Sequence, residues 1–324
     1  MCDEFVTLLR TRFLIGADEG APISYMLGMR ITQDLTRGFI SMAMPAAIRK
    51  IAEAHLTPEQ LVKMRSVNTP MCVEGVTPIP IDDTTTARAD GNYPFREVLG
   101  SVMHVGNWVR PDIMYAVNSL AKCAGNPGVV HAKALDRLLG YLMNSADTGI
   151  RFSRPSPVDY PRIPFSRAST ELLMYSDASF ADTGTRRSRL GFVAMYNGGP
   201  VSYMASEGRT VDTSTMEAEL HAAIHAAKEA VHLSDLLHDL GITPRRECIT
   251  IKEDNSALIV RAQGGIKAVR ALKHVQVRIR FVQWLILEER IIFQYTPTNL
   301  QLADIFTKPL PPESFLRLKG QILH

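Results

Sequence analysis

The sequence between residues 189 and 206 leaves few choices of local structure. Two runs rich in β-branched, aromatic and small apolar residues, 189–196 and 200–206, flank the sequence Asn197–Gly198–Gly199. Asparagine and glycine accept the positive φ angles that a tight turn between antiparallel strands requires, so this pattern predicts a β-hairpin. Residues 171–177 predict one further strand before the hairpin.

The residues after the hairpin alternate between helix and strand patterns. A cap at Thr213/Ser214 begins a long helix, which continues to about Leu240 and is ended by Gly241. Residues 275–290 fit both an alternating strand and a helix; because sixteen residues is long for a strand, we predict a helix. The remaining elements are strands at 248–253 and 291–295, and short helices at 255–263 and at about 300–308. Three strands followed by helices alternating with strands indicate an α/β fold, a mixed sheet with helices packed on it.

Two segments are typical of connectors. Residues 68–94 are rich in Pro, Thr, Asp and Gly, and residues 153–168 contain four prolines. The second segment predicts a domain boundary near residue 160. Before it, the pattern is mostly helical, with helices expected at 110–124 and 129–143.

Composition limits the class of protein. The net charge of +3 permits a nucleic-acid partner without requiring one. The four cysteines lie far apart with no C-x-x-C pair, which argues against a cysteine zinc site or a disulfide framework and fits a reducing compartment. No apolar run reaches the roughly 18 residues of a membrane-spanning helix, and the acidic residues near the start are unlike a secretion signal. We expect an intracellular protein with no membrane partner.

Acidic residues occur where the predicted elements meet. Asp177 ends the first strand, Asp254 ends the fourth, and Glu219 lies in the first turns of the long helix, with Asp304 of the last helix as a fourth member. Functional sites in mixed α/β sheets gather at strand ends. Two carboxylates about 4 Å apart repel by about 4 kcal/mol at an effective dielectric constant of 20, and divalent cations remove that cost. Oxygen ligands alone favour Mg²⁺ or Mn²⁺, and a pair of such ions activates water for phosphodiester hydrolysis. Three acids at element ends also occur by chance in many domains.

Six ordered segments resemble the ribonuclease H blocks of copia-type retrotransposon Pol polyproteins. They are residues 175–182, 186–203, 213–223, 253–257, 272–282 and 294–311, the last containing LADIFTKPL. The resemblance implies a ribonuclease H-like five-stranded mixed sheet with flanking helices. It also implies that Asp177, Glu219, Asp254 and Asp304 are catalytic, metal-binding carboxylates that hold two Mg²⁺ (or Mn²⁺) ions. The expected enzyme cuts the RNA strand of an RNA–DNA hybrid during reverse transcription, without a small-molecule cofactor.

Glu217 competes with Glu219 for the ligand position. At about 100° per residue, Glu217, His221 and Lys228 fall on one polar stripe of the helix, whereas Glu219 points roughly 155° away from the centre of that stripe. The sequence Glu-Leu-x-Ala around Glu219 also matches the stretch around the catalytic glutamate of retroviral and cellular ribonucleases H, so we predict Glu219 as the ligand. His221 and His225 have the i, i+4 spacing of a zinc pair, but their place on the polar stripe favours a solvated surface.

This sequence departs from related enzymes in two places. The loop 296–299 has no histidine, so His274 is a candidate for the proton-relay role, with a phosphate or capping contact as the alternative. Residues 206–209 replace a common Lys-Lys-Gln run, which predicts weaker hybrid binding. The basic residues expected to contact hybrid phosphates, against the alternative of a generic solvated surface, are Lys267, Arg270, Lys273, His274 and Arg278. Minor-groove contacts to 2′-hydroxyls would distinguish the RNA strand.

The N-terminal half resembles the last part, thumb and connection of the copia-type reverse transcriptase. The matching segments are residues 23–31, 95–122 and 126–152. The paired aspartates of the polymerase are expected upstream of residue 1, and Asp82–Asp83 lies in a connector, so no polymerase activity is predicted. This half is expected either to pack against the ribonuclease domain or to guide the template.

The expected organisation is a reverse transcriptase part (1–152), a linker (153–169), a ribonuclease H domain (170–312) and a C-terminal tail (313–324). The expected partners are the RNA–DNA hybrid and the rest of the polyprotein, in a cytoplasmic virus-like particle and/or the nucleus. Two alternatives stay open. One is a decayed or host-recruited remnant that binds nucleic acid without cutting it, and the other is a fragment of a longer polyprotein.

Overall fold

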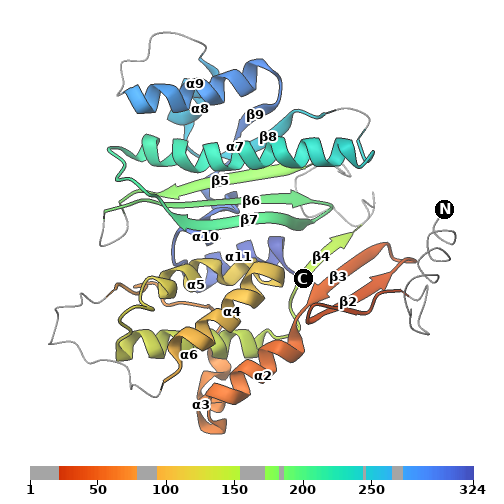
Figure 1. The fold of residues 1–324 in the computed structure, drawn as a ribbon, viewed down its shortest axis with the longest axis vertical. Coiled ribbons are helices and arrows are strands. Elements are labelled where there is room, and N and C mark those ends of the chain that lie inside the picture. Colours follow the sequence, from red (N-terminus) through yellow and green to blue (C-terminus); the bar gives the residue numbers. More distant parts are fainter. Residues whose placement is uncertain (1–21, 79–92, 154–171, 182–185, 244–245, 265–272) are drawn as a thin grey trace, which may run out of the picture.

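The computed structural model describes residues 22–78, 93–153, 172–181, 186–243, 246–264 and 273–324. Figure 1 shows two parts stacked on each other: a sheet with helices on both faces, and a mainly helical N-terminal half with a small sheet at its side. Within the described residues, no helix combines the length and apolar character needed to cross a membrane. Residues 82–83, 267 and 270 lie outside the described residues.

The larger sheet is mixed and five-stranded, as expected. Its strand order is β7–β6–β5–β8–β9, with β5 to β7 antiparallel and β8 and β9 parallel to β5. The strands are β5 (Leu173–Ser179), β6 (Arg189–Tyr196), β7 (Gly199–Glu207), β8 (Ile249–Glu253) and β9 (Ile291–Tyr295). The hairpin prediction is confirmed, since Asn197 and Gly198 have φ angles of 50° and 79° in the turn between β6 and β7.

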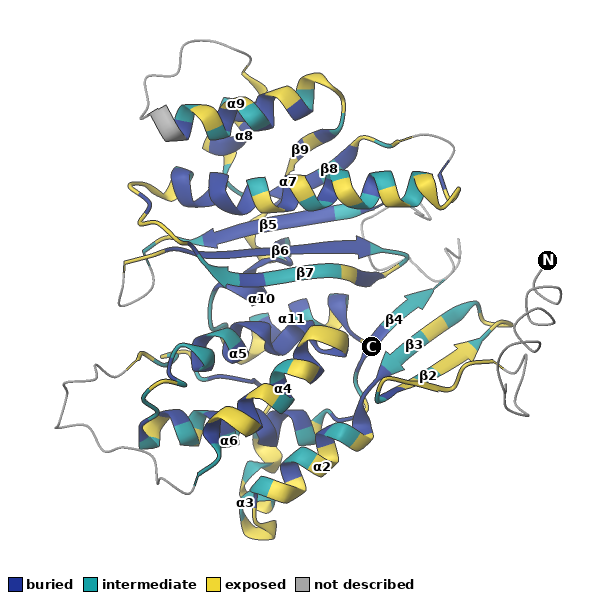
Figure 2. Ribbon diagram, in the orientation of Figure 1, coloured by how far each residue is buried: buried dark blue, intermediate teal, exposed yellow. Residues whose placement is uncertain are grey.

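Three helices cover one face of this sheet (Figures 1 and 2). They are α7 (Thr215–Asp239), α8 (Ser256–Gln263) and α9 (Lys273–Leu287), so the prediction of a helix at 275–290 is confirmed. Ser214 caps α7 by accepting a hydrogen bond from the backbone N–H of Glu217, and Gly241 follows the helix with a φ of 70°. The side of α7 that packs on β5, β6 and β8 is made largely of buried alanines: Ala218, Ala222, Ala223, Ala226, Ala227 and Ala230.

The N-terminal half is mostly helical but also contains a small antiparallel sheet that the sequence did not predict. The helices are α2 (Pro45–His55), α3 (Pro58–Lys63), α4 (Phe95–Val109), α5 (Met114–Ala121) and α6 (Val129–Asn144). The strands, in sheet order, are β1 (Tyr25–Met26), β2 (Met29–Asp34), β3 (Phe39–Ala43) and β4 (Ile150–Ser153). The helix expected at 129–143 is confirmed as α6. The helix expected at 110–124 is shorter, because a 3₁₀ turn at Pro111–Ile113 precedes α5.

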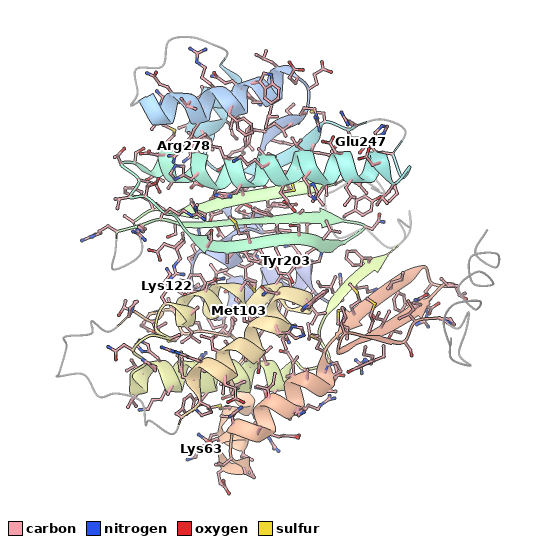
Figure 3. The ribbon with its side chains drawn as sticks, viewed as in Figure 1. Lys63, Met103, Lys122, Tyr203, Glu247 and Arg278 are labelled. Atoms are coloured by element: carbon pink, nitrogen blue, oxygen red, sulfur yellow. The ribbon has the colours of Figure 1, made fainter. Side chains whose placement is uncertain are left out.

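The two parts share one apolar core. The Tyr203 hydroxyl of β7 donates a hydrogen bond of 2.8 Å to the carbonyl of Gly106 in α4, and its ring stacks on that of Phe306. Lys122 forms an ion pair with Glu207 across the same boundary. Figure 3 shows Tyr203 and Met103 where β7 meets α4. The N-terminal half therefore packs against the sheet's second face, which is one of the two roles expected for it.

The last residues, expected as a tail, form a helix within this shared core. Helix α11 (Pro312–Ile322) buries Phe315, whose ring meets that of Tyr141 edge to face with 5.7 Å between centroids. After the helix, His324 and Gly149 exchange two backbone hydrogen bonds of 3.1 Å. The C-terminal end of the chain is thus held against α6 and the start of β4.

A buried ion pair lies at the centre of the N-terminal half. The Arg110 guanidinium donates from Nε and Nη2 to the two oxygens of Asp112, at 2.9 and 2.8 Å, and both side chains are fully buried. Tyr141 donates to the same carboxylate, and Nη1 of Arg110 donates to the carbonyl of Ser145. Bidentate geometry and satisfied neighbours are the conditions under which a buried pair is tolerated.

We expect Asp112→Asn to destabilise the protein by about 3–5 kcal/mol, because it leaves the Arg110 charge buried without its counter-ion. Urea unfolding of the full chain measures this loss. The matched control is Asp147→Asn, which removes an exposed carboxylate that pairs with Arg30 and Arg49 and should change stability by less than about 1 kcal/mol. Equal effects of the two substitutions would contradict the importance of the buried pair.

Candidate metal-binding active site

Four acidic side chains from distant parts of the sequence meet at one edge of the five-stranded sheet. Carboxylate oxygens of Asp177 on β5, Glu219 on α7 and Asp254 after β8 lie within 4.8 Å of one another. Asp304, which begins the short helix α10 (Asp304–Thr307), joins them through Lys308. The Lys308 ammonium lies 2.8 Å from Oδ1 of Asp304 and 3.8 Å from Oδ2 of Asp177. We call these four residues the carboxylate cluster.

Strand register explains why Asp177 and Asp254 meet. β5 and β8 are parallel neighbours, and Tyr175 pairs with Lys252, so the carboxyl ends of both strands reach the same edge of the sheet. Helix α7 crosses β5 and β6 on one face, which brings Glu219, in its first two turns, over the end of β5.

A glycine brings in the fourth carboxylate from the other face. Gly191 of β6 pairs with Asp177, and a Cβ atom there would lie 2.8 Å from Thr307 and 2.9 Å from Phe306. Only glycine therefore lets α10 approach this closely. The approach allows Thr307 to donate a hydrogen bond to Oδ2 of Asp177, and it places Asp304 beside that carboxylate.

Burial and mutual repulsion raise the pKa values within the cluster. Burial, followed by the charges of Glu253, Asp177 and Asp254, raises the pKa of Glu219 to about 10. Burial and the charge of Asp177 raise the pKa of Asp304 to about 7, against the opposing effect of Lys308. Burial also raises the pKa of Asp177. Without a cation, the site thus favours protonated carboxyls over a concentrated negative charge.

Within the described residues, Lys308 pairs with two carboxylates of the cluster, Asp177 and Asp304. Burial disfavours its ammonium form, but the charges of Asp177 and Asp304 outweigh this effect and raise its pKa. One ammonium does not balance the four carboxylates. Oε2 of Glu219 is also buried with no hydrogen-bond partner among the described residues. An all-oxygen ligand set with a surplus of negative charge and an unsatisfied buried oxygen fits a hard divalent cation such as Mg²⁺ or Mn²⁺.

Glu253 is a fifth carboxyl group at the site that the sequence reasoning missed. It is fully buried, accepts a hydrogen bond of 2.8 Å from the Ser176 hydroxyl, and its pKa is raised to about 8, first by burial. The period-two pattern of β8 places it on the same face as Ile249 and Ile251, towards α7. This alternation could have identified Glu253 from the sequence. It did not, because a charged residue at the end of a strand is ordinarily exposed to solvent.

The loop without a histidine orients Asp254. Within residues 296–299, the Thr298 hydroxyl donates a hydrogen bond of 2.7 Å to Oδ2 of Asp254. Thr298 thus fixes the orientation of the Asp254 carboxylate. The other oxygen of Asp254, Oδ1, remains available to bind a metal ion together with the other carboxylates of the cluster. Hydrogen bonds of this kind to metal ligands determine their orientation.

The structure separates Glu217 from the carboxylate cluster. Glu217 is buried beside Asp212 and His221, on a different side of α7 from Glu219. The expectation of a solvated stripe is therefore wrong for Glu217 and His221, because α9 and the residues preceding α7 cover them; His225, one turn further on, is exposed. Arg278 of α9 lies 3.7 Å from Glu217 and is partly exposed.

The other expected nucleic-acid contacts lie at the start of α9 or before it. Lys273 and His274 open the helix, but their side chains lie outside the described part of the chain, as do Lys267 and Arg270 entirely. The roles proposed for these four residues therefore stay predictions. Arg278 is the one member of the set whose side chain is described, and its nearest acidic partner is Glu217.

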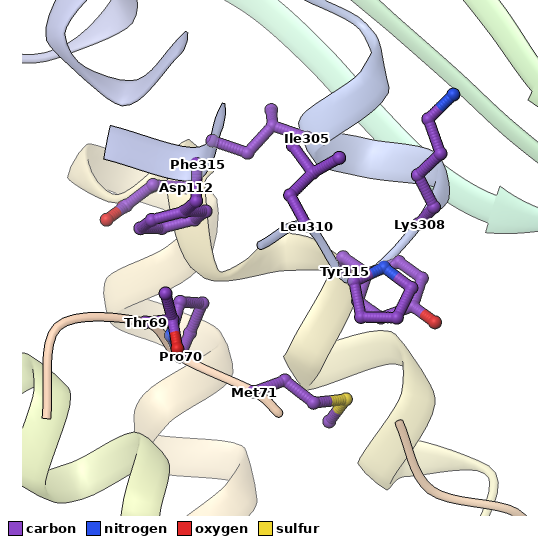
Figure 4. Close-up of a pocket in the computed structure, with 10 residues that line it drawn as sticks. Thr69, Pro70, Met71, Asp112, Tyr115, Ile305, Lys308, Leu310 and Phe315 are labelled. Carbon is purple, nitrogen blue, oxygen red and sulfur yellow. The ribbon is translucent and has the colours of Figure 1, made fainter. Parts of the chain in front are cut away.

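A small pocket lies behind the cluster, between the two parts of the chain (Figure 4). It is lined by residues 69–71 and by Tyr115, Leu310 and Phe315, among others, and its volume of about 10 Å³ holds no more than a single water. The aliphatic stem of Lys308 forms part of the wall, while its ammonium points away from the pocket. The pocket therefore belongs to the packing between the halves and is not a substrate site.

Comparisons with known sequences identify relatives over most of the chain. The chain is 26% identical over 303 residues to the retrovirus-related Pol polyprotein from transposon TNT 1-94 of Nicotiana tabacum, which covers 91% of this chain and 21% of that polyprotein. It is 27% identical over 229 residues to the corresponding polyprotein from transposon RE1 of Arabidopsis thaliana, covering 70% of the chain and 15% of that polyprotein. The chain thus spans about a fifth or less of these two relatives. No family model matches it.

A shorter relative matches part of the chain. The secreted RxLR effector protein 161 of Plasmopara viticola is 35% identical over 144 residues, which cover 44% of this chain and 93% of that protein. Among solved structures, LC11-RNase H1, isolated from compost, covers 46% of this chain and 98% of its own, at 17% identity and a TM-score of 0.34. The foamy viral protease–reverse transcriptase in complex with double-stranded DNA covers 85% of this chain and 38% of its own, at 15% identity and a TM-score of 0.40.

These structural scores are low, so the assignment of the fold rests on strand order and direction. Three antiparallel strands followed by two strands parallel to the first, with α7 to α9 on one face, form the arrangement that the sequence resemblance implied. The sequence relatives extend across both halves of the chain. The chain is therefore similar over most of its length to retrovirus-related Pol polyproteins of copia-like transposons, and its five-stranded sheet has the ribonuclease H-like arrangement.

Proposed function

We propose that this chain cuts the RNA strand of RNA–DNA hybrids endonucleolytically, with residues 170–312 as the catalytic unit. The observation that carries the proposal is the meeting of Asp177, Glu219 and Asp254 within 4.8 Å, with Asp304 joined to them through Lys308. Acidic residues that are raised in pKa and share one partly open site are typical of functional centres.

In this proposal, the carboxylate cluster holds two Mg²⁺ or Mn²⁺ ions. When bound, such ions activate a water molecule and stabilise the leaving oxygen of the phosphodiester, to give a 3′-hydroxyl and a 5′-phosphate. Thr307 and Thr298 fix the orientation of Asp177 and Asp254. Lys308 offsets part of the negative charge that the cluster presents to an incoming phosphate.

In this proposal, the N-terminal half holds the ribonuclease sheet in position. It covers the second face of the ribonuclease sheet and carries the connection to the rest of the polyprotein, which we propose as its protein partner in a cytoplasmic virus-like particle and/or the nucleus. The absence of polymerase activity stays a prediction from the sequence.

One observation favours the alternative of a nucleic-acid-binding remnant that does not cut. Glu207 lies where the family commonly has a basic run, and it forms an ion pair with Lys122 of the N-terminal half. This segment therefore supports the interface between the two parts and adds no positive charge for a hybrid. Salt-dependent hybrid binding without cleavage, at any Mg²⁺ or Mn²⁺ concentration, would support the remnant.

We expect Asp254→Asn to lower hybrid cleavage more than about 100-fold, because even outer partners of metal ligands contribute about 10–100-fold. The assay uses the full chain, a labelled RNA–DNA hybrid and Mg²⁺ or Mn²⁺. Asp239→Asn, at the other end of α7, is the control and should cleave like the unaltered chain. Cleavage that survives Asp254→Asn would refute the assigned site.

We also expect Mg²⁺ to stabilise the protein more strongly at pH 8.5 than at pH 5.5. The folded carboxyls have raised pKa values, so the folded chain keeps protons that the unfolded chain loses above about pH 4. Stability without metal therefore falls as pH rises towards the folded pKa values of about 7 for Asp304 and about 10 for Glu219. Mg²⁺ replaces these protons and offsets the loss.

Thermal melting with Mg²⁺ or with EDTA at both pH values measures this effect. Glu219→Gln removes a carboxyl whose pKa is raised to about 10 and should reduce the difference in the Mg²⁺ effect between the two pH values. A Mg²⁺ effect of the same size at both pH values in the unaltered chain would show that the raised carboxyls are not where the ion binds.

A further inference from the structure

A second group of potential metal ligands lies at the start of α7, apart from the carboxylate cluster. Asp212 precedes the helix, and Glu217 and His221 are one turn apart on it, about 160–200° around the helix from Glu219. One ligand atom of each of the three lies within 4.8 Å of the others, and all three residues are buried. We call them the Asp-Glu-His group.

The Asp212 carboxylate is buried and shares one ion pair with His221. Its side chain is 0% exposed, Oδ1 lies 2.7 Å from Nδ1 of His221, and Oδ2 makes no well-formed hydrogen bond among the described residues. Burial raises the pKa of Asp212, but the His221 ring and the Ser188 hydroxyl outweigh this and hold it below its ordinary value. A buried anion in this condition is costly unless a cation satisfies it.

His221 presents a second unsatisfied atom. The residue is 8% exposed, and its Nε2 has no hydrogen-bond partner among the described residues. The Ser188 hydroxyl, which lowers the pKa of Asp212, is also buried beside this group. Buried polar atoms are normally paired, so the unsatisfied Oδ2 of Asp212 and Nε2 of His221 indicate a missing ligand.

Glu217 is already oriented for such a ligand. Its Oε2 accepts hydrogen bonds from the backbone N–H and the hydroxyl of Thr213, at 2.8 and 2.7 Å. Its Oε1 lies 3.7 Å from Arg278. Outer hydrogen bonds that fix a carboxylate in this way are typical of metal sites in proteins.

We propose that Asp212, Glu217 and His221 bind one divalent transition-metal ion of the Zn²⁺ class, independently of the Mg²⁺-type site at the carboxylate cluster. A ligand set of one imidazole and two carboxylates favours Zn²⁺ over Mg²⁺, and three protein ligands leave a coordination position for water. Bound there, the ion connects the segment before α7 to the turns of the helix that carry Glu219. The role is therefore to hold that end of α7 in place.

Zinc binding to the full chain tests the proposal. Metal-stripped protein in excess Mg²⁺ is titrated with Zn²⁺ against a chromophoric chelator, and Co²⁺ is used as a spectroscopic probe of the ligand type. We expect one tightly bound Zn²⁺ per chain and a Co²⁺ spectrum with nitrogen and oxygen ligands and no thiolate band. A chain that binds no Zn²⁺ in excess Mg²⁺, or a thiolate spectrum, would overturn the proposal without the need for any variant.

Three variants assign the ligands. Asp212→Asn and His221→Gln should each weaken Zn²⁺ binding at least 10-fold, whereas His225→Gln, which alters the exposed histidine one turn away, should not. Melting temperatures in EDTA show whether each variant is folded. Equal binding by His221→Gln and the unaltered chain would mean that Asp212 and His221 form only a buried ion pair.

Asp254→Asn separates this proposal from the proposed nuclease. It removes a residue of the carboxylate cluster and should leave Zn²⁺ binding unchanged. Loss of cleavage with Zn²⁺ binding retained supports two independent sites. If Zn²⁺ binding is lost in Asp254→Asn, the ion occupies the carboxylate cluster and the Asp-Glu-His group is not a metal site.

Discussion

Repulsion between buried carboxylates is the constraint around which the C-terminal part of this structure is organised. Asp177, Glu219, Glu253 and Asp304 lie together at the ends of β5 and β8 with raised pKa values, a state that the fold maintains only because other contacts hold each side chain in place. Thr307, Thr298 and Ser176 each donate a hydrogen bond to one carboxyl group, and Lys308 supplies a positive charge. These supports come from separate elements, so the site is complete only when the sheet and its helices on both faces are assembled.

The two parts of the chain depend on each other through a common core. The second face of the five-stranded sheet packs on α10 and also on α4 and α5 of the N-terminal half, through residues such as Tyr203. Helix α11, which follows the carboxylate-bearing elements in sequence, packs against α6 of the N-terminal half. Lys308 and α11 belong to the same short C-terminal stretch, and the buried Arg110–Asp112 pair lies close to that helix through Tyr141. The position of the five-stranded sheet is therefore tied to the packing of the N-terminal half.

Local patterns in the sequence were sufficient for most of the C-terminal fold. The hairpin, the capped α7 and the helix at α9 follow from turn residues, caps and periodicity, which act over a few neighbouring positions. The sheet β1–β4 was missed because two of its strands are only two and four residues long, and β3 pairs with β4 across more than a hundred residues, as in Phe39 with Ser153. The sequence alone could not predict that three distant carboxylates meet, because this depends on the order of the strands in the sheet. The resemblance to a known family supplied that order for Asp177, Glu219 and Asp254. The burial of Glu217 and His221 could not be predicted from the sequence. Helical periodicity assigns polar residues to the solvent-exposed face, and it gives no information about the tertiary contacts with Asp212 and α9 that cover these two residues.

Strand β5 is approached from both sides over the smallest side chains available. Ala218 and Ala222 let α7 lie close on one face, and Gly191 on the neighbouring strand lets α10 lie close on the other. A carboxylate has a fixed and short reach, so the separation between these layers decides whether the acids can share an ion at all. Residues with no reactive group therefore set the distance between the carboxylates, and a single added methyl group would increase it.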